Sequence, residues 1–190
     1  DGLFRSDWGM LDVLALRWLY GTRAAGTGND TYILGARESA GQTTLVDDGG
    51  VDAIDASALT SGVSLDLNAG RLSSVGVTKA GFNGVENLGL PLSTLLEDAV
   101  GSPFDDVLLG NALDNRLTGG LGNDWIEGNA GTDTAVYAGK RTDYEVSNGF
   151  GKVFVEGRNG TAGFDTLLGV ERLQFADQLV VLADQVLGAD

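Results

Sequence analysis

Short apolar segments alternate with longer segments of Gly, Asp and Asn between residues 101 and 136, with a period of nine. Each nine-residue block begins with Gly, has Asp or Asn at its sixth position and has an aliphatic residue at its eighth. The residues at the eighth position are Leu108, Leu117, Ile126 and Ala135. Gly and Asp favour tight turns, and three residues with an apolar centre suit a strand that buries one side chain. The pattern predicts a solenoid in which two blocks form one coil.

The sixth positions indicate where a cation would bind. In such a solenoid the first and third blocks stack on one side, which places Asp106 beside Asp124. Two carboxylates at close range repel each other unless a cation lies between them. Calcium takes roughly 6–8 oxygen ligands from carboxylates and carbonyls, and it tolerates irregular geometry. The repeat therefore predicts calcium between stacked turns.

Upstream of the repeat the pattern is looser but related. Residues 26–32 and 47–55 carry Gly and Asp at similar spacing before an apolar residue. Alternating or apolar runs predict further strands at 44–46, 63–67 and 92–100. We interpret these segments as irregular, wider coils of the same roll, with loops inserted at 33–43 and 68–91.

Both ends of the chain lack the nine-residue period. Residues 7–20 are apolar nearly all round at helical spacing, which predicts a helix packed on the roll, with Asp7 as N-cap and Gly21 as stop. After residue 137, short strands are predicted at 144–147, 152–156, 165–168, 170–175 and 179–182. The first two form a hairpin and the others close the end of the solenoid. Asp165 is expected to cap the next strand, with binding of another ion as the alternative.

Composition narrows the range of functions. The chain has 27 acidic and 12 basic residues, a formal net charge of -15, and neither His nor Cys. The charge argues against nucleic-acid binding, because phosphate contacts need clustered Lys and Arg. Without Cys there are no disulfides or thiolate nucleophiles, and without His the commonest general base and zinc ligand are missing. The sequence also has no apolar run long enough to span a membrane.

Catalysis by this chain is not expected. An enzyme built from it would need carboxylates alone, or calcium as a Lewis acid. Asp105 and Asp106 resemble an acid–base pair, but neighbouring residues in a strand point to opposite faces. We therefore expect a binding and structural role, with no enzyme activity.

The nine-residue pattern carries a family resemblance. Residues 101–136 resemble the RTX repeats of secreted bacterial proteins, whose calcium-binding nonapeptide is Gly-Gly-x-Gly-x-Asp-x-U-x. The wider chain resembles the C-terminal domain of the serralysins, which are secreted zinc metalloproteases. This likeness is carried by DVLALRWLYG at 12–21, DDGGVDAIDASALTSGVSLDLNAGRLSSVG at 47–76 and LLEDAVGSPFDDVLLGN at 95–111. The segment GFDTLLGVERLQFAD at 163–177 is similar to the ends of many other RTX proteins, and the serralysin zinc motif HExxHxxGxxH is absent.

The resemblance implies an all-β fold, a parallel β-roll (a calcium-binding RTX solenoid) with an N-terminal packing helix and a β-rich C-terminal cap. It divides the chain into a helix carried over from an upstream domain at 1–24, the β-roll at 25–136, and the cap with a secretion region at 137–190. It also implies a secreted, extracellular monomer. Such a chain uses a type I secretion apparatus, folds on extracellular calcium, and serves an upstream protease domain as its secretion and stability module.

The resemblance further implies calcium ligands in the repeats. One turn supplies carbonyl oxygens from its second and fourth positions and the acid of its sixth. The turn one coil later supplies carbonyls from its first and third positions and its own acid. One site would use Ser102, Phe104, Asp106, Gly119, Leu121 and Asp124. A second would use Asn111, Leu113, Asn115, Gly128, Ala130 and Asp133, and is expected to bind more weakly because Asn115 replaces a carboxylate.

Two further calcium sites are implied in the irregular coils. The first would use Gly26, Gly28, Asp30, Asp47, Gly49 and Asp52. The second would use Gly50, Asp52, the carbonyl of Leu95 and the side chain of Glu97. Glu86 is the alternative to Glu97, which is preferred because its segment leads directly into the repeats.

A function from a different class stays open. As an RTX interaction module, the roll would present the loops 33–43 and 77–94 to a polysaccharide or a host protein. Glycan binding by the calcium-saturated chain would favour this alternative.

Overall fold

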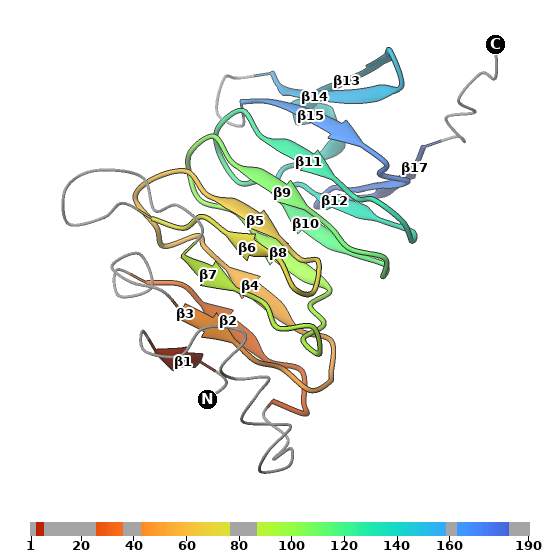
Figure 1. The fold of residues 1–190 in the computed structure, drawn as a ribbon. Helices are drawn as coiled ribbons and strands as arrows, with labels where there is room; N and C mark the ends of the chain where they lie inside the picture. Colours follow the sequence, from red (N-terminus) through yellow and green to blue (C-terminus); the bar gives the residue numbers. More distant parts are fainter. Residues whose placement is uncertain (1–2, 6–25, 36–42, 77–86, 159–162, 183–190) are drawn as a thin grey trace.

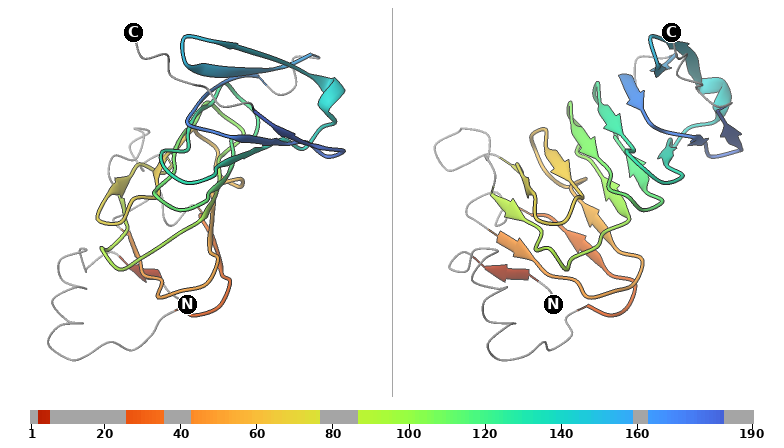
Figure 2. Two further views of the ribbon diagram at one scale, coloured as in Figure 1. Left: turned by 90° about the vertical axis from the view of Figure 1, so that its right-hand side faces the viewer. Right: turned by 45° about the vertical axis from the view of Figure 1, so that its right-hand side comes forward.

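The computed structural model describes residues 3–5, 26–35, 43–76, 87–158 and 163–182 (Figure 1). The described chain winds into a roll of short strands, with the N-terminal strands at one end and a cap of longer strands at the other (Figure 1, Figure 2). The helix predicted at 7–20 lies outside the described residues. Among the residues described, no helix is long and apolar enough to cross a membrane.

One face of the roll is a seven-stranded sheet. Its strands, in spatial order, are β17 (Leu179–Val181), β16 (Arg172–Gln174), β12 (Thr134–Val136), β10 (Arg116–Thr118), β8 (Asp98–Val100), β4 (Ala53–Asp55) and β2 (Thr31–Ile33). Neighbouring strands from β2 to β16 are parallel, and β17 pairs antiparallel with β16. The parallel order is that of a β-roll, as the resemblance implies.

The opposite face is a six-stranded sheet. Its strands are β13 (Tyr144–Gly149), β14 (Lys152–Gly157), β15 (Phe164–Leu168), β11 (Trp125–Glu127), β9 (Val107–Leu109) and β5 (Ser64–Asp66). The strands from β5 to β15 are parallel, while β13 and β14 form the predicted hairpin. The nine-residue blocks alternate between the sheets: β9 and β11 stack in one, and β10 and β12 in the other. This arrangement confirms the coil of two blocks.

The apolar eighth positions of the blocks form the core of the roll. All four are buried, namely Leu108, Leu117, Ile126 and Ala135. The sheet register sets Leu108 opposite Ile126 across β9 and β11. Burying one Leu or Ile side chain stabilises a fold by about 1.5–3 kcal/mol. The nine-residue pattern therefore predicts the core correctly, with one inward side chain for each strand.

A four-stranded sheet corrects the prediction of a loop at 68–91. Its strands are β1 (Leu3–Arg5), β3 (Thr43–Leu45), β7 (Leu88–Gly89) and β6 (Leu72–Ser73). Strand β7 is parallel to β3, and β6 turns back antiparallel on β7. The Asn87 side chain ties this excursion to Val75, because its Nδ2 donates to Val75 O at 2.9 Å and its Oδ1 accepts from Val75 N at 2.8 Å. The strands β6 and β7 have two residues each, which is too short to show a period, so the pattern missed them.

The cap closes the roll around an aromatic cluster. The rings of Tyr137, Tyr144 and Phe175 pack with centroids 5.1, 5.4 and 5.3 Å apart. The hairpin of β13 and β14 turns at Phe150 and Gly151, whose φ values of 55° and 71° suit a type I′ turn. Strands β15 and β16 continue the two parallel sheets by one coil. The predicted β cap is thus an extension of the roll as well as a cover for its end.

Candidate metal centres

The turns of the roll bring acidic and amide side chains into two columns. The long column precedes strands of the seven-stranded sheet and consists of Asp30, Asp52, Glu97, Asn115, Asp133 and Glu171. The short column belongs to the six-stranded sheet and consists of Asp106, Asp124 and Asp165. Because each member adjoins a strand of the parallel ladder, the register of the sheets sets the spacing of the columns.

Hydrogen bonds link members of each column that lie one coil apart. In the short column, the backbone N–H of Asp106 donates to Asp124 Oδ1 at 2.9 Å. In the long column, the backbone N–H of Asp133 donates to Glu171 Oε2 at 2.7 Å. One carboxylate oxygen therefore serves the turn one coil earlier, and the other oxygen is left for a different partner.

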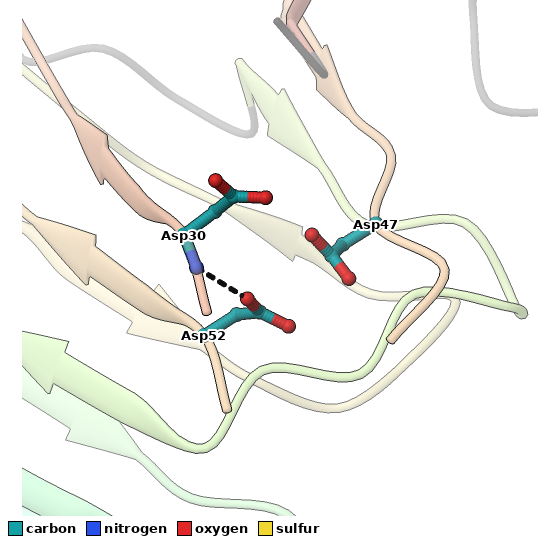
Figure 3. A group of neighbouring side chains, drawn as sticks. All are labelled: Asp30, Asp47 and Asp52. Atoms are coloured by element: carbon teal, nitrogen blue, oxygen red, sulfur yellow. Dashed lines mark hydrogen bonds between the residues drawn. The ribbon is translucent and has the colours of Figure 1, made fainter. Parts of the chain in front are cut away.

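Three carboxylates gather at the N-terminal end of the long column. Asp30, Asp47 and Asp52 each offer an oxygen, and these oxygens lie within 4.8 Å of one another. The three side chains face a common space (Figure 3). Gly26 has a φ of 60°, and a Cβ there would lie 2.4 Å from Asp47 Oδ2 and 3.1 Å from Asp30 Oδ2. The Tyr32 hydroxyl donates to Asp47 Oδ2. The structure thus brings together the three predicted acids, and their oxygens suit a divalent cation.

The second irregular site is assembled around Asp52 and Glu97. The backbone N–H of Asp52 donates to Glu97 Oε2 at 2.8 Å. Asp52 Oδ2 is buried and has no hydrogen-bond partner among the described residues. Gly50 stacks on Gly28, since a Cβ on Gly50 would lie 2.1 Å from Gly28 O. Glu97 is therefore where the prediction places it, whereas Glu86 lies outside the described residues.

In the first repeat site, oxygens converge beside Gly101. A Cβ on Gly101 would lie 2.4 Å from both Asp106 Oδ2 and Gly119 O. Ser102 supports Asp106 through its backbone N–H to Oδ2 at 2.6 Å and its hydroxyl to Oδ1 at 2.8 Å. Asp124 is 2% exposed, and its Oδ2 has no hydrogen-bond partner in the described part of the chain. The predicted carboxylates and one predicted carbonyl thus lie together.

The second repeat site has the same arrangement with an amide in place of one carboxylate. A Cβ on Gly110 would lie 2.4 Å from Gly128 O and 2.5 Å from Asn115 Oδ1. Asn115 Nδ2 donates to Glu97 O at 2.9 Å and lies 3.2 Å from Asn111 Oδ1. The amide is therefore held by hydrogen bonds, and the weaker calcium binding expected at this site stays a prediction.

Carbonyl oxygens of several predicted ligands face the next coil. Cβ atoms on Gly120, Gly122 and Gly131 would lie 2.4, 2.7 and 2.4 Å from the carbonyl oxygens of Ser102, Phe104 and Leu113, respectively. A side chain at these glycines would displace the backbone that carries the carbonyls. The carbonyl oxygens of Gly26 and Asn111 accept the backbone N–H groups of Asp48 and Ala130, at 3.1 and 3.3 Å. The remaining carbonyl ligands stay predictions, namely those of Gly49, Gly50, Leu95, Leu121 and Ala130.

Burial disfavours the ionised form of the column carboxylates when no cation is bound. Burial, followed by the neighbouring charge of Asp165, raises the pKa of Asp124 to about 8. Burial raises the pKa of Asp133 to about 7, and Glu171 adds to the shift. Burial likewise raises the pKa of Asp52 to about 6. Each of these three side chains leaves Oδ2 buried without a hydrogen-bond partner among the residues described. A divalent cation fits these positions, because it neutralises the carboxylates and occupies the orphaned oxygens.

Comparison with known proteins gives the identity of the cation. Residues 100–135 match the RTX calcium-binding nonapeptide repeat, in four copies. Calcium is therefore the ion that these repeats bind. A search of curated proteins found no match to the chain. The matched segment contains the two repeat sites, while the Asp30–Asp47–Asp52 cluster and the cap lie outside it.

Two acidic members of the columns, Asp165 and Glu171, lie outside the four predicted ligand sets. Asp165 Oδ1 accepts the backbone N–H of Asp124, one coil earlier, at 3.1 Å, and the predicted strand cap and the alternative ion at Asp165 both stay predictions. Glu171 had no predicted role, and in the long column its Oε2 likewise accepts the backbone N–H of Asp133, one coil earlier. Both share a sequence signal, because each follows a glycine, Gly163 or Gly169, by two positions.

Proposed function

We propose that this chain is a calcium-dependent folding module that works outside the cell, as the secretion and stability module of a serralysin-like zinc metalloprotease. The observation that supports the calcium module is the pair of carboxylate columns: in the matched RTX repeats, Asp124 Oδ2 and Asp133 Oδ2 are buried and have no hydrogen-bond partner among the described residues. The catalytic part would precede this chain, and the chain itself would have no enzyme activity.

Coupling between calcium and folding follows from the burial of the columns. In the coiled state Asp106 and Asp124 are both 2% exposed, and they lie one coil apart. Burying an ionised carboxylate without a compensating charge is strongly unfavourable. Calcium held by these carboxylates would remove that cost, so the free energy of binding would stabilise the coil, as in other proteins that fold on binding a metal.

This coupling suits export. Extracellular calcium sites typically bind at about 10⁻⁴–10⁻³ M. At the low calcium concentration inside a cell, the carboxylates within each column would repel one another. The roll would then stay loose enough to be exported by a type I secretion apparatus. Outside the cell calcium would occupy the turns, and the roll would fold after export.

Circular dichroism of the full chain tests the calcium module. We expect calcium to increase the far-UV β signal and the thermal stability, with a midpoint in the range of extracellular sites. Magnesium at the same concentration is the control, because its demand for near-octahedral geometry fits these irregular oxygen sites poorly. A β signal and a melting temperature that do not change with calcium would contradict the proposal.

The protease link has a separate test. It is supported by the resemblance of segments 12–21, 47–76 and 95–111 to serralysins. We expect the coding sequence upstream of Asp1 to contain HExxHxxGxxH. A different catalytic or adhesive module there would overturn the protease link, leave the calcium module standing, and favour the interaction module with a polysaccharide or host protein.

A further inference from the structure

The cap repeats a hydrogen-bond arrangement from the irregular coils. The backbone N–H groups of Glu97 and of the residue after it donate to Asp52 O, at 3.1 and 3.0 Å, while Asp52 N donates to Glu97 Oε2 at 2.8 Å. The backbone N–H groups of Glu171 and of the residue after it donate to Asp133 O, also at 3.1 and 3.0 Å, while Asp133 N donates to Glu171 Oε2 at 2.7 Å. Glu171 therefore has the same position relative to Asp133 as Glu97 has relative to Asp52.

Oxygen atoms from the roll and the cap converge beside Gly128. A Cβ on Gly128 would lie 2.1 Å from Gly169 O and 2.5 Å from Asp133 Oδ2. At Gly101, in the repeat, a Cβ would likewise meet an acid oxygen and the carbonyl of a glycine one coil later, both at 2.4 Å. The carbonyl of Gly169 thus takes the place that a first-position carbonyl takes in the matched repeats, although it lies in the cap.

The Asp133 carboxylate supplies a second, independent sign of a ligand. Asp133 is 0% exposed, and its Oδ1 accepts the backbone N–H of Asn115 at 2.8 Å. Its Oδ2 is the oxygen beside Gly128, and it has no hydrogen-bond partner among the described residues. A buried anionic oxygen without a partner is costly, and this one points into a space shared with a carbonyl oxygen.

We propose that the cap turn 169–171 completes a further calcium site, with the Asp133 carboxylate, the Gly169 carbonyl and the Glu171 carboxylate as ligands. The inference rests on the proposed function, because the same ion would fill the repeats and this site. The ion would join the last repeat turn to the cap, between the parallel strands β12 and β16. Closure of the roll by its cap would then depend on calcium as well as on the aromatic cluster.

The substitution Glu171→Gln separates a calcium ligand from a simple hydrogen-bond acceptor. Gln keeps a side-chain oxygen for the backbone N–H of Asp133 but removes the charge that calcium needs. Glu145→Gln is the matched control, because Glu145 is an exposed residue of β13 in the same cap. Native mass spectrometry of the full chain at saturating calcium counts the bound ions in wild type and both variants.

We expect Glu171→Gln to bind one calcium ion fewer than wild type, and Glu145→Gln to bind the same number as wild type. An unchanged count in a folded Glu171→Gln variant overturns the inference while the proposed function stands. A wild-type chain that binds no calcium overturns the proposed function itself. If Glu171→Gln does not fold, Glu171→Asp decides: restored folding with the wild-type count supports the site, and failure to restore either overturns it.

Discussion

The short and long columns use similar turns but satisfy their acid positions in different ways. In the short column Asp106 is followed by Asp124, which keeps a buried oxygen without a partner among the described residues. In the long column Asn115 takes the place of a carboxylate, and its Nδ2 donates to Glu97 O. The comparison contrasts a position with two carboxylates, which needs a cation to offset their charges, with a position where an amide offsets part of that need by a hydrogen bond to the neighbouring turn.

The largest expected effect comes from removing a charge from the short column. Asp124 accepts the backbone N–H of Asp106 on one side, and on the other its own N–H donates to Asp165. The substitution Asp124→Asn keeps an oxygen for the backbone N–H of Asp106 but removes one of the two carboxylate charges of the first repeat site. We expect the calcium midpoint of folding, followed by circular dichroism, to rise about tenfold or more, which corresponds to at least ~1.4 kcal/mol.

Asp105→Asn is the matched control for this prediction. Asp105 adjoins the short column but is exposed, and its Oδ1 accepts the backbone N–H of Asn123 at 2.8 Å, a bond that Asn also makes. Its midpoint should stay near that of wild type. Equal midpoints for Asp124→Asn and Asp105→Asn would mean that the column charge does not hold the ion.

The reverse substitution, Asn115→Asp, would make the long column resemble the short one. It adds a carboxylate to the second repeat site and removes the amide donor to Glu97 O. With calcium we expect tighter binding: the calcium midpoint of folding should fall a few-fold, which corresponds to less than ~1.4 kcal/mol. Without calcium we expect a smaller β signal than wild type. Calorimetric titration measures the calcium affinity, and circular dichroism measures the β signal without calcium. A variant with the calcium affinity and the β signal of wild type would contradict the difference proposed between the two columns.

We expect pH to have a smaller effect on folding of the roll, and this effect should have opposite directions with and without calcium. The raised pKa values of Asp124 (about 8) and Asp133 (about 7) mean that the folded, calcium-free chain holds protons that the unfolded chain has released. The stability that these protons provide is fully present below about pH 4, the ordinary range of Asp, and is lost as pH rises through about 7 and 8. Calcium must displace the same protons, so its apparent affinity should fall as pH falls.

Circular dichroism at pH 5 and pH 8 measures both trends. With a chelator present the β signal should be larger at pH 5. With limiting calcium it should be larger at pH 8. The same sign of change in both conditions would show that protons and calcium do not compete for the columns.

The regular repeat could be predicted from the sequence because its information is local. Asp106 and Leu108 belong to one block, and the same block recurs without a shift. The period therefore fixes which side chain is buried and which acids stack one coil apart. The convergence of oxygens beside Gly101 follows from the same register, since Asp106 belongs to the same block as Gly101 and Gly119 begins the block one coil later.

The cap end of both columns could not be predicted because its information is not local. Asp133 and Glu171 are 38 residues apart, and Asp124 and Asp165 are 41 apart, with the β13–β14 hairpin inserted between them. The insertion breaks the nine-residue period, so the short motifs before Asp165 and Glu171 do not reveal which turn they stack on. Only the parallel pairing of β15 and β16 with the repeat strands brings them into line.

Anomalous diffraction from crystals grown with calcium tests the central claim most directly. We predict anomalous peaks between stacked turns, with one peak in contact with Asp106 and Asp124 and none at the exposed Asp105. Well-ordered crystals in which no ion contacts Asp106 or Asp124 would contradict the claim that calcium closes the coils of this roll.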